Sequence, residues 1–318
     1  MWNSRSGDAS LKRICGALCL LCAALLTGFS ASSQARSYDD LMAAGEILIA
    51  VYRDFPPYSY QEEGHDRGVD VELAQAIAAG LGLELKLHWM IADENLDDDL
   101  RNHVWKGHYL AREEEGVMLK RNVADLMLRV PYDREFAYKI DPDGRVINDL
   151  VHFFAPYQRE RWALTYDAEK MAPFENLAVF QYDTVGVEID SLPDFYLSGA
   201  FRGRLLSNVE HFSSTQLALE AVDRQQVSAV MGTQSQLQWG ALRLARTEQL
   251  LMADVPFPNL LKRSWDVGMA VKDSHRQLAY AVEDIVDLMV KSGQFDRLYR
   301  SYGVQYSKPD RYRLDAPD

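Results

Sequence analysis

Cysteine is nearly absent from the sequence. The 318 residues contain three, Cys15, Cys19 and Cys22, and all of them lie within the first 22 positions. This placement excludes disulfide bonds, a thiolate metal site and a cysteine nucleophile from the rest of the chain. The stability of that remainder must come from its core, and a composition of 47% apolar residues is sufficient for a large one.

Long hydrophobic runs are lacking too, except for one near the start, residues 14–29, which follows Lys12 and Arg13. This run is shorter than the ~20 residues needed to span a bilayer. It is followed by Ser33-Gln34-Ala35, which places small residues at the two positions that a signal peptidase reads. We therefore predict a signal peptide over residues 1–35 and a periplasmic mature protein, with an uncleaved membrane anchor as the alternative.

An excess of basic residues is missing as well. The formal net charge is −13, and residues 1–35 contribute +2, so the chain from residue 36 onward carries −15. Such acidity disfavours nucleic acids and anionic membrane surfaces as partners. The sequence also lacks a nucleophile elbow, a metalloprotease motif and a phosphate-binding loop. We therefore predict no catalytic residues and no cofactor.

What the sequence does contain is an alternation of short apolar strands and amphipathic helices. Residues 46–52 form a β-branched apolar run typical of a buried strand. Apolar residues at every fourth position then predict a helix that begins near Val69 and ends at Gly80 and Gly82. Similar segments follow at residues 123–130, 149–156, 184–189, 214–225, 227–232, 266–271 and 277–293. This alternation predicts an α/β class with mainly parallel sheets flanked by helices.

Several short motifs also occur in a characteristic order along the chain. They are Pro56-Pro57-Tyr58, Gly68-x-Asp70-Val71-Glu72-Leu73, residues 123–126, Arg134, residues 227–230, Gly293-Gln294-Phe295 and Tyr302-Gly303. The ordered set resembles the amino-acid-type periplasmic solute-binding proteins of ABC importers, solute-binding protein family 3. Val69 departs from the family pattern, in which an aromatic or longer aliphatic residue is usual, so the chain resembles a divergent member.

The resemblance implies a two-lobed periplasmic binding protein fold of type II, with the ligand held between the lobes. Lobe 1 would comprise residues 38–150 plus 260–318, and lobe 2 residues 151–259, with hinges near 153–156 and 256–258. General physics agrees, because ligands of open α/β sheets bind beyond the carboxyl ends of the strands. An interlobe cleft can also close by hinge motion.

In resembling proteins, the loop that corresponds to residues 131–136 supplies an arginine for the ligand's carboxylate. Arg134 falls at that position, and a planar fork of donors suits a carboxylate. The alternative is a surface ion pair with Asp133 or Glu135, worth under ~1 kcal/mol. The hydroxyl residues usual five and three positions earlier are replaced by Arg129 and Pro131.

Thr233 stands where many relatives place an aspartate for the ligand's ammonium group. Because a cationic amine would then be unpaired in the cleft, we expect a small polar or anionic solute. Arg129 and Thr233 are candidate ligand contacts. Ser191 is another, since it would cap a helix whose N–H groups often meet a ligand carboxylate, although Asp190 beside it would repel an anion.

The loop after the first strand contains the aromatic residues Tyr52, Phe55 and Tyr58. In resembling proteins this loop lays an aromatic ring on the ligand, and aromatic faces suit a planar or apolar ligand body. Simple packing beside the two prolines is the alternative. We include all three among the expected ligand-binding residues.

Residues 93–122 form an acidic segment that departs from the family, with roughly 15 extra residues between Gly107 and Val123. Its two histidines lie five apart, which is off helical register, and no EF-hand spacing is present. We therefore expect no metal site. A lid or a partner-docking insertion is the preferred reading, with Trp105 and Tyr109 expected to cover the cleft.

The preferred function is a monomeric periplasmic protein that binds a small solute and delivers it to an ABC permease. One alternative is an accessory or sensor subunit of a periplasmic quinoprotein alcohol dehydrogenase system, with a dehydrogenase or cytochrome as partner. Another is a periplasmic dehydratase of cyclic carboxylic acids, in which Asp54 or Glu135 would act as proton donor.

Overall fold

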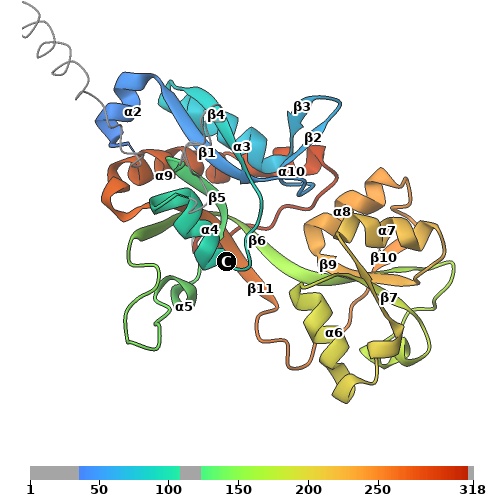
Figure 1. The fold of residues 1–318 in the computed structure, drawn as a ribbon. Coiled ribbons are helices and arrows are strands. Elements are labelled where there is room, and N and C mark those ends of the chain that lie inside the picture. The colour runs from blue at the N-terminus through green and yellow to red at the C-terminus, as the bar shows by residue number, and fades with distance from the viewer. Residues whose placement is uncertain (1–35, 108–122, 314–318) are drawn as a thin grey trace, which may run out of the picture. The chain divides into compact units, whose positions relative to one another are not determined.

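The computed structural model describes residues 36–107 and 123–313 (Figure 1). They belong to one compact unit of the chain. The predicted signal peptide, residues 1–35, therefore lies outside the described residues. No helix in the described ranges is long and apolar enough to cross a membrane.

The strands form one sheet path in the order β4-β1-β5-β11-β6-β9-β7-β8, and β10 pairs with β6 beside this path (Figure 1). Their bounds are β1 Glu46–Tyr52, β4 Glu84–Met90, β5 Leu126–Pro131, β6 Val151–Asp167, β7 Val185–Glu188, β8 Val209–Phe212, β9 Ala229–Thr233, β10 Leu250–Met252 and β11 Ser264–Lys272. A separate hairpin joins β2 Tyr60–Glu62 and β3 His65–Arg67.

Each end of this path is a parallel sheet. Strand β1 is parallel to both β4 and β5, and β7 is parallel to both β8 and β9. Between them, β11 and β6 run antiparallel to their neighbours, and β6 is long enough, at 17 residues, to take part in both sheets. The prediction of a two-lobed α/β fold with mainly parallel sheets is confirmed.

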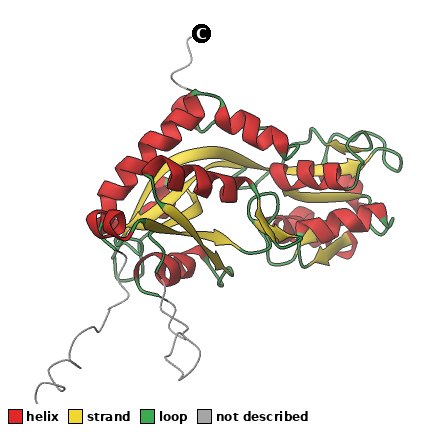
Figure 2. Cartoon of the chain, turned by 90° about the horizontal axis from the view of Figure 1, so that it is seen from above, coloured by secondary structure: helices red, strands yellow, loops and turns green. Residues whose placement is uncertain are grey.

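The helices pack on both sides of the strands, as Figure 2 shows. Their bounds are α2 Tyr38–Ala44, α3 Val69–Leu81, α4 Leu96–Leu100, α5 Arg134–Ala137, α6 Leu192–Gly203, α7 Thr215–Asp223, α8 Gln234–Arg243, α9 Arg276–Lys291 and α10 Gln294–Ser301. A π-helical turn, Arg101–Trp105, continues α4. Short 3-10 turns lie at Leu177–Gln181, Leu206–Asn208, Asp273–His275 and Asp310–Tyr312.

Separate apolar cores support the two sheets. In the first, the buried face of α3 packs with β1 and α9, which explains the four-residue apolar repeat in the sequence. Gly80 lies inside α3 rather than ending it, and a Cβ there would lie 2.7 Å from the Cδ1 atom of Ile285 on α9. The helix ends at Leu81, and Gly82, which has a left-handed backbone, is its C-cap. In the second lobe, strands β7 and β9 pack against α6, α7 and α8.

Candidate functional site

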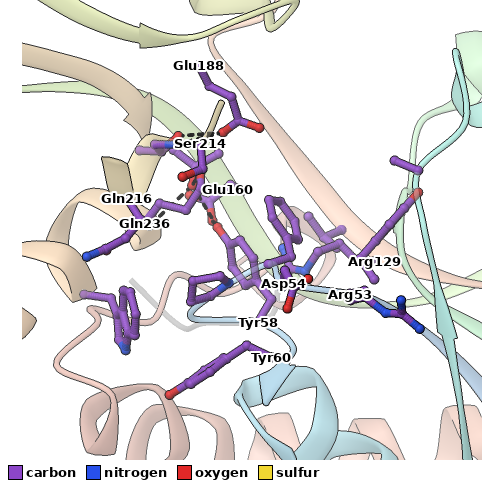
Figure 3. A pocket seen from close by; sticks show the side chains of 18 of the residues that line it. Arg53, Asp54, Tyr58, Tyr60, Arg129, Glu160, Glu188, Ser214, Gln216 and Gln236 are labelled. Carbon is purple, nitrogen blue, oxygen red and sulfur yellow. Dashed lines mark hydrogen bonds between the residues drawn. The ribbon is translucent and has the colours of Figure 1, made fainter. Parts of the chain in front are cut away.

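The described residues enclose a cavity of about 960 Å³ at the carboxyl ends of the parallel strands (Figure 3). It is lined by the segments that follow β1 and β4 in one lobe and β7, β8 and β9 in the other, together with side chains of β5, β6 and β11. Because every parallel strand ends at this cavity, loops and helix N-termini of both lobes converge on it.

Aromatic rings make up much of the cavity wall. The contributing residues are Tyr52, Phe55, Tyr58, Tyr60, Trp162, Trp239 and Trp265. They form close pairs, with ring centroids 4.9 Å apart for Trp162 and Trp265 and 5.6 Å apart for Tyr60 and Trp239. Such surfaces favour a ligand with a planar or apolar body.

Arg129 is placed in the cavity wall by an irregularity of strand β5. Leu128 pairs with Met269 and Val130 with Gly268, so Arg129 is the extra residue of a β-bulge, with a left-handed backbone at φ 61°. Gly268 is required opposite the bulge, because a Cβ there would lie 2.7 Å from the carbonyl oxygen of Phe154. The bulge turns a strand residue toward α3 and the cavity.

The guanidinium of Arg129 is paired with a carboxylate of the protein. Its Nε lies 2.6 Å from Oδ2 of Asp70, and its Nη2 lies 3.1 Å from Oδ1 of Asp70 and 2.8 Å from Oε1 of Gln158. The guanidinium carbon also lies 3.4 Å from the ring centroid of Tyr58. Burial opposes the charge of Arg129, but the Asp70 carboxylate and the surrounding tyrosines together outweigh it and raise the pKa of Arg129 well above its usual value.

Glu160 is a second buried carboxylate, only 2% exposed, and protein donors surround it. Its Oε2 accepts hydrogen bonds from Tyr58 Oη at 2.6 Å, Ser235 Oγ at 2.7 Å and Gln158 Nε2 at 2.9 Å, and its Oε1 accepts one from the backbone N–H of Arg161. Burial and the charge of Glu160 raise the pKa of the Tyr58 hydroxyl, which therefore stays a donor. Figure 3 shows this hydroxyl directed at Glu160.

A third carboxylate, Glu188 at the end of β7, lies at the N-terminus of α7 (Figure 3). Its Oε2 accepts hydrogen bonds from the backbone N–H of Thr215 at 3.0 Å and from the Thr215 hydroxyl at 2.9 Å. Ser214 caps the same helix by accepting from the N–H of Leu217. The positive end of α7 is thus already neutralised by the protein.

Five of the residues that the sequence nominated for ligand binding line this cavity: Tyr52, Phe55, Tyr58, Arg129 and Thr233. The Tyr52 hydroxyl donates to Oδ2 of Asp99 at 2.8 Å, so the edge of this side chain is held by α4. Thr233 is the N-cap of α8, where its hydroxyl oxygen accepts from the N–H of Gln236.

Arg134 and Ser191 lie elsewhere. Asp133 caps the short helix α5, so Arg134 becomes its first residue and is exposed beside a separate hollow of about 570 Å³, with its guanidinium 6.0 Å from the Tyr138 ring. Ser191 is the N-cap of α6, where its Oγ accepts from the N–H of Asp194 and donates to the carbonyl of Glu188.

The acidic segment that the sequence singled out is described only as far as residue 107. Asp93, Asp99 and His103 place three ligand atoms within 4.8 Å of one another. The Asp99 oxygens already accept hydrogen bonds from the N–H of Asp93 and from Tyr52, and burial raises the pKa of Asp99. Trp105 packs against the core next to α4 instead of covering the cavity, whereas Tyr109 lies outside the described residues.

Sequence reasoning missed several residues of the cavity wall. They are Tyr60, Glu160, Trp162, Glu188, Trp239 and Trp265. Glu188 lies near the end of the strand predicted over residues 184–189, and a position at the carboxyl end of a strand could have marked it as a candidate cavity residue. The others come from β6, β11, α8 and the β2 hairpin, whose approach to the cavity depends on tertiary packing.

Comparison with known proteins finds a family match over one part of the chain. Residues 47–104 match the family model of bacterial extracellular solute-binding proteins, family 3. Over 67 residues the chain is 39% identical to a cyclohexadienyl dehydratase of Pseudomonas aeruginosa, a stretch that amounts to 21% of this chain and only 25% of that protein.

Solved structures extend the likeness to most of the described chain. An ancestral cationic amino acid solute-binding protein superposes with a TM-score of 0.60 at 16% identity, over 83% of this chain and 98% of its own. An amino acid ABC transporter substrate-binding protein of Streptococcus pneumoniae with bound L-arginine gives 0.55 at 20% identity, over 83% and 97%. A histidine kinase sensor domain gives 0.54 at 16% identity, over 83% and 98%. At these identities the likeness concerns the fold.

Proposed function

We propose that the chain, whose residues 47–104 match the bacterial extracellular solute-binding proteins, family 3, and whose fold is that of solved solute-binding proteins, captures a small polar solute in the cavity of about 960 Å³. The observation that carries the proposal is the convergence of aromatic walls and polar side chains at the carboxyl ends of parallel strands from both lobes. This is the usual construction of a small-molecule site.

The same proposal includes export and delivery. Residues 1–35 would direct the chain to the periplasm and be removed, and an ABC permease would receive the solute. Lobe 1 would comprise residues 38–150 plus 260–318 and lobe 2 residues 151–259, closing on the solute about the connecting segments of β6 and β11. In support, both strands run between the two parallel sheets.

The position of Arg134 narrows the class of solute. The sequence predicted a small polar or anionic solute, because Thr233 replaces an aspartate that would pair with an amine, and it placed Arg134 in the cleft for a carboxylate. Arg134 instead lines the other hollow. Arg129, which does line the cavity, is already paired with Asp70. A polar solute without an obligatory carboxylate therefore fits the cavity better.

The decisive experiment is a thermal-shift screen of the protein without residues 1–35 against amino acids, amines, carboxylic acids, alcohols and sugars. A solute at about 100 times its Kd should add ~2.7 kcal/mol to the free energy of unfolding. Trp162→Ala should weaken the binding of any solute found, because this ring lines the cavity, whereas Arg134→Ala should leave the Kd unchanged.

An accessory role in a periplasmic quinoprotein alcohol dehydrogenase system is the competing function for the same fold. Its support is a departure from the amino-acid-binding pattern at Arg129, Pro131 and Thr233. If no solute in the screen shifts the melting temperature while a dehydrogenase or cytochrome co-purifies with the protein, the importer function is overturned in favour of this one.

A dehydratase function has one observation in its favour, the 67-residue similarity to cyclohexadienyl dehydratase. Of the two carboxylic acids considered as proton donors, Asp54 lines the cavity and Glu135 lies on α5. Incubating the protein with each stabilising solute and following the solute by NMR tests this function. Unchanged spectra after many binding cycles would eliminate it.

A further inference from the structure

Besides the exposed Arg53, three positively charged elements face the cavity, and they share one property. They are the guanidinium of Arg129, the N-terminus of α7 and the N-terminus of α8. In an anion-binding cavity these would be the groups that receive the ligand, because helix N-termini and arginines attract negative charge.

Each of the three is already in contact with a carboxylate of the protein itself. Asp70, which is 1% exposed, forms a two-point ion pair with Arg129. Glu188 accepts the first N–H of α7, and Glu160 accepts the hydroxyl of Ser235 in the first turn of α8. An anionic solute would have to compete with these internal carboxylates for Arg129 and for the first N–H of α7, and it would meet the charge of Glu160 beside α8.

The charges that line the cavity have the opposite sign from those of an anion receptor. Its positive side chains are Arg53 and Arg129, and its negative ones are Asp54, Glu160 and Glu188. With Asp70 behind Arg129 there are four negative groups against two positive ones. Arg53 and Asp54 are both exposed and adjacent, so they largely offset each other. The other charged groups then carry a net negative charge, and their electrostatic potential favours a cation.

Two side-chain oxygens near the N-terminus of α7 lack a hydrogen-bond donor among the described residues. The Oε1 atom of Glu188 accepts no hydrogen bond from any residue that the structure describes, since both contacts from Thr215 reach Oε2. At the second residue of α7, the buried Oε1 of Gln216 likewise has no partner within the described ranges. Both residues line the cavity (Figure 3). A solute that donates hydrogen bonds would find an acceptor in Oε1 of Glu188, whereas a carboxylate would not.

The aromatic residues of the cavity wall also favour a positively charged solute. Tyr60 and the tryptophans Trp162, Trp239 and Trp265 offer π faces, which attract organic cations. We propose that the cavity selects an organic cation, an amine or amidine on an apolar or aromatic body without a free carboxylate, and that Glu188 receives its positive group. This inference rests on the proposed solute-binding function and names the class of solute.

The test uses compounds matched in their bodies and different in charge. Tyramine, tyrosine and 3-(4-hydroxyphenyl)propionate form one set, and agmatine and arginine another, each titrated calorimetrically into the protein without residues 1–35. The expected result is that an amine binds at least tenfold more tightly than its carboxylate-bearing counterpart. Equal or tighter binding of a carboxylate-bearing member overturns the inference but leaves solute binding intact. If no member of either set binds and the broader screen also fails, the proposed function itself fails.

Glu188→Gln provides the residue-level test, since glutamine keeps an acceptor for Thr215 and removes the charge. We expect it to weaken amine binding at least tenfold and to improve binding of the matched acid, because the N-terminus of α7 loses its internal anion. Glu210→Gln is the matched control: it removes the same charge from the exposed face of neighbouring strand β8, and we expect an unchanged Kd. An unchanged amine Kd in Glu188→Gln, with a native circular dichroism spectrum, overturns the assignment of Glu188.

Discussion

Arg129 combines a left-handed backbone, a nearly buried side chain and a two-point ion pair at one position. Each feature is costly on its own, because a non-glycine residue at positive φ is strained and a buried charge is desolvated. Together with Asp70 they fasten β5 to the start of α3. The residue is therefore part of the framework of the cavity wall as well as one of its charged groups.

Replacement of Asp70 tests this framework role. Asp70→Asn leaves the guanidinium of Arg129 buried without its counter-charge, and we expect the free energy of unfolding to fall by about 3–5 kcal/mol. Urea denaturation followed by tryptophan fluorescence measures the change. Arg134→Ala serves as the control, because that exposed side chain should contribute less than ~0.5 kcal/mol. A loss below ~1 kcal/mol in Asp70→Asn would show that the pair is not a stability determinant.

Both members of this pair were visible in the sequence, but their contact was not. Asp70 stood in the helix-start motif and Arg129 among the departures from the family pattern, 59 positions apart. Only the bulge in β5 brings them together, and a bulge depends on the neighbouring strand through Gly268. Arg134 was expected in the cleft, whereas in the structure it is the first residue of the one-turn helix α5 and lines the other hollow.

At the scale of elements, periodicity predicted the first strand and helix closely. The apolar run 46–52 coincides with β1, and the four-residue repeat coincides with α3. The segment predicted over residues 149–156 covers only the start of β6, which extends to Asp167. In the structure β6 continues through Pro156, where the ladder with β11 is irregular and Ala155 has φ 45°. Proline is tolerated in a strand at such a bulge.

The cap of α6 gives a prediction for Ser191, which the sequence had nominated for ligand contact. Ser191→Ala removes the acceptor for the N–H of Asp194, and we expect a loss of about 0.5–2 kcal/mol in the free energy of unfolding. The Kd for a cavity solute should not change, because Ser191 does not line the cavity. A tenfold higher Kd at unchanged stability would show instead that Ser191 contacts the solute.

Strand β4 carries a pH-sensitive residue, His88, whose pKa is lowered by burial. Its Nε2 lies 2.9 Å from Nδ1 of His103. The unfolded chain takes up a proton near pH 6.5 whereas the folded one does so only at lower pH, so the stability is present above about pH 6.5 and is lost as the pH falls from there through the folded pKa. We expect the melting temperature to fall between pH 7.5 and 5.5, and to fall less in His88→Gln.

The comparison variant for this pH effect is His211→Gln. His211 lies in the other lobe beside Asp194, with its Nε2 2.9 Å from the carboxylate, and does not contact His88. If His88→Gln and the wild-type protein lose the same number of degrees over this pH range, burial of His88 is not a source of acid sensitivity.

At the scale of the whole molecule, the two sheets are connected more firmly than by a flexible linker. Strand β6 belongs to both, and the Tyr58 hydroxyl of one lobe bonds Glu160 on β6 and lies 2.9 Å from Oγ1 of Thr233 in the other lobe. The first core also includes Trp239 of α8. These shared elements couple the two cores.

We therefore expect the lobes to unfold together. Urea transitions followed by far-UV circular dichroism and by tryptophan fluorescence should have the same midpoint, because β6 cannot leave one sheet without disturbing the other. Tyr58→Phe should lower that midpoint while keeping the two curves coincident. Two separated transitions in the wild-type protein would show that the lobes unfold independently.

Strand β11, which pairs with β5, limits how the chain can be divided. A fragment that ends at residue 150 would retain β1, β4 and β5 but lose both β6 and β11. Strand β5 would then present an unpaired edge flanked by Met127, Leu128 and Val130, all of which are fully buried in the intact chain. Such an apolar edge templates pairing with other chains and leads to aggregation. Protection of the β5 edge thus depends on β11, which is synthesised only after β1, β4 and β5.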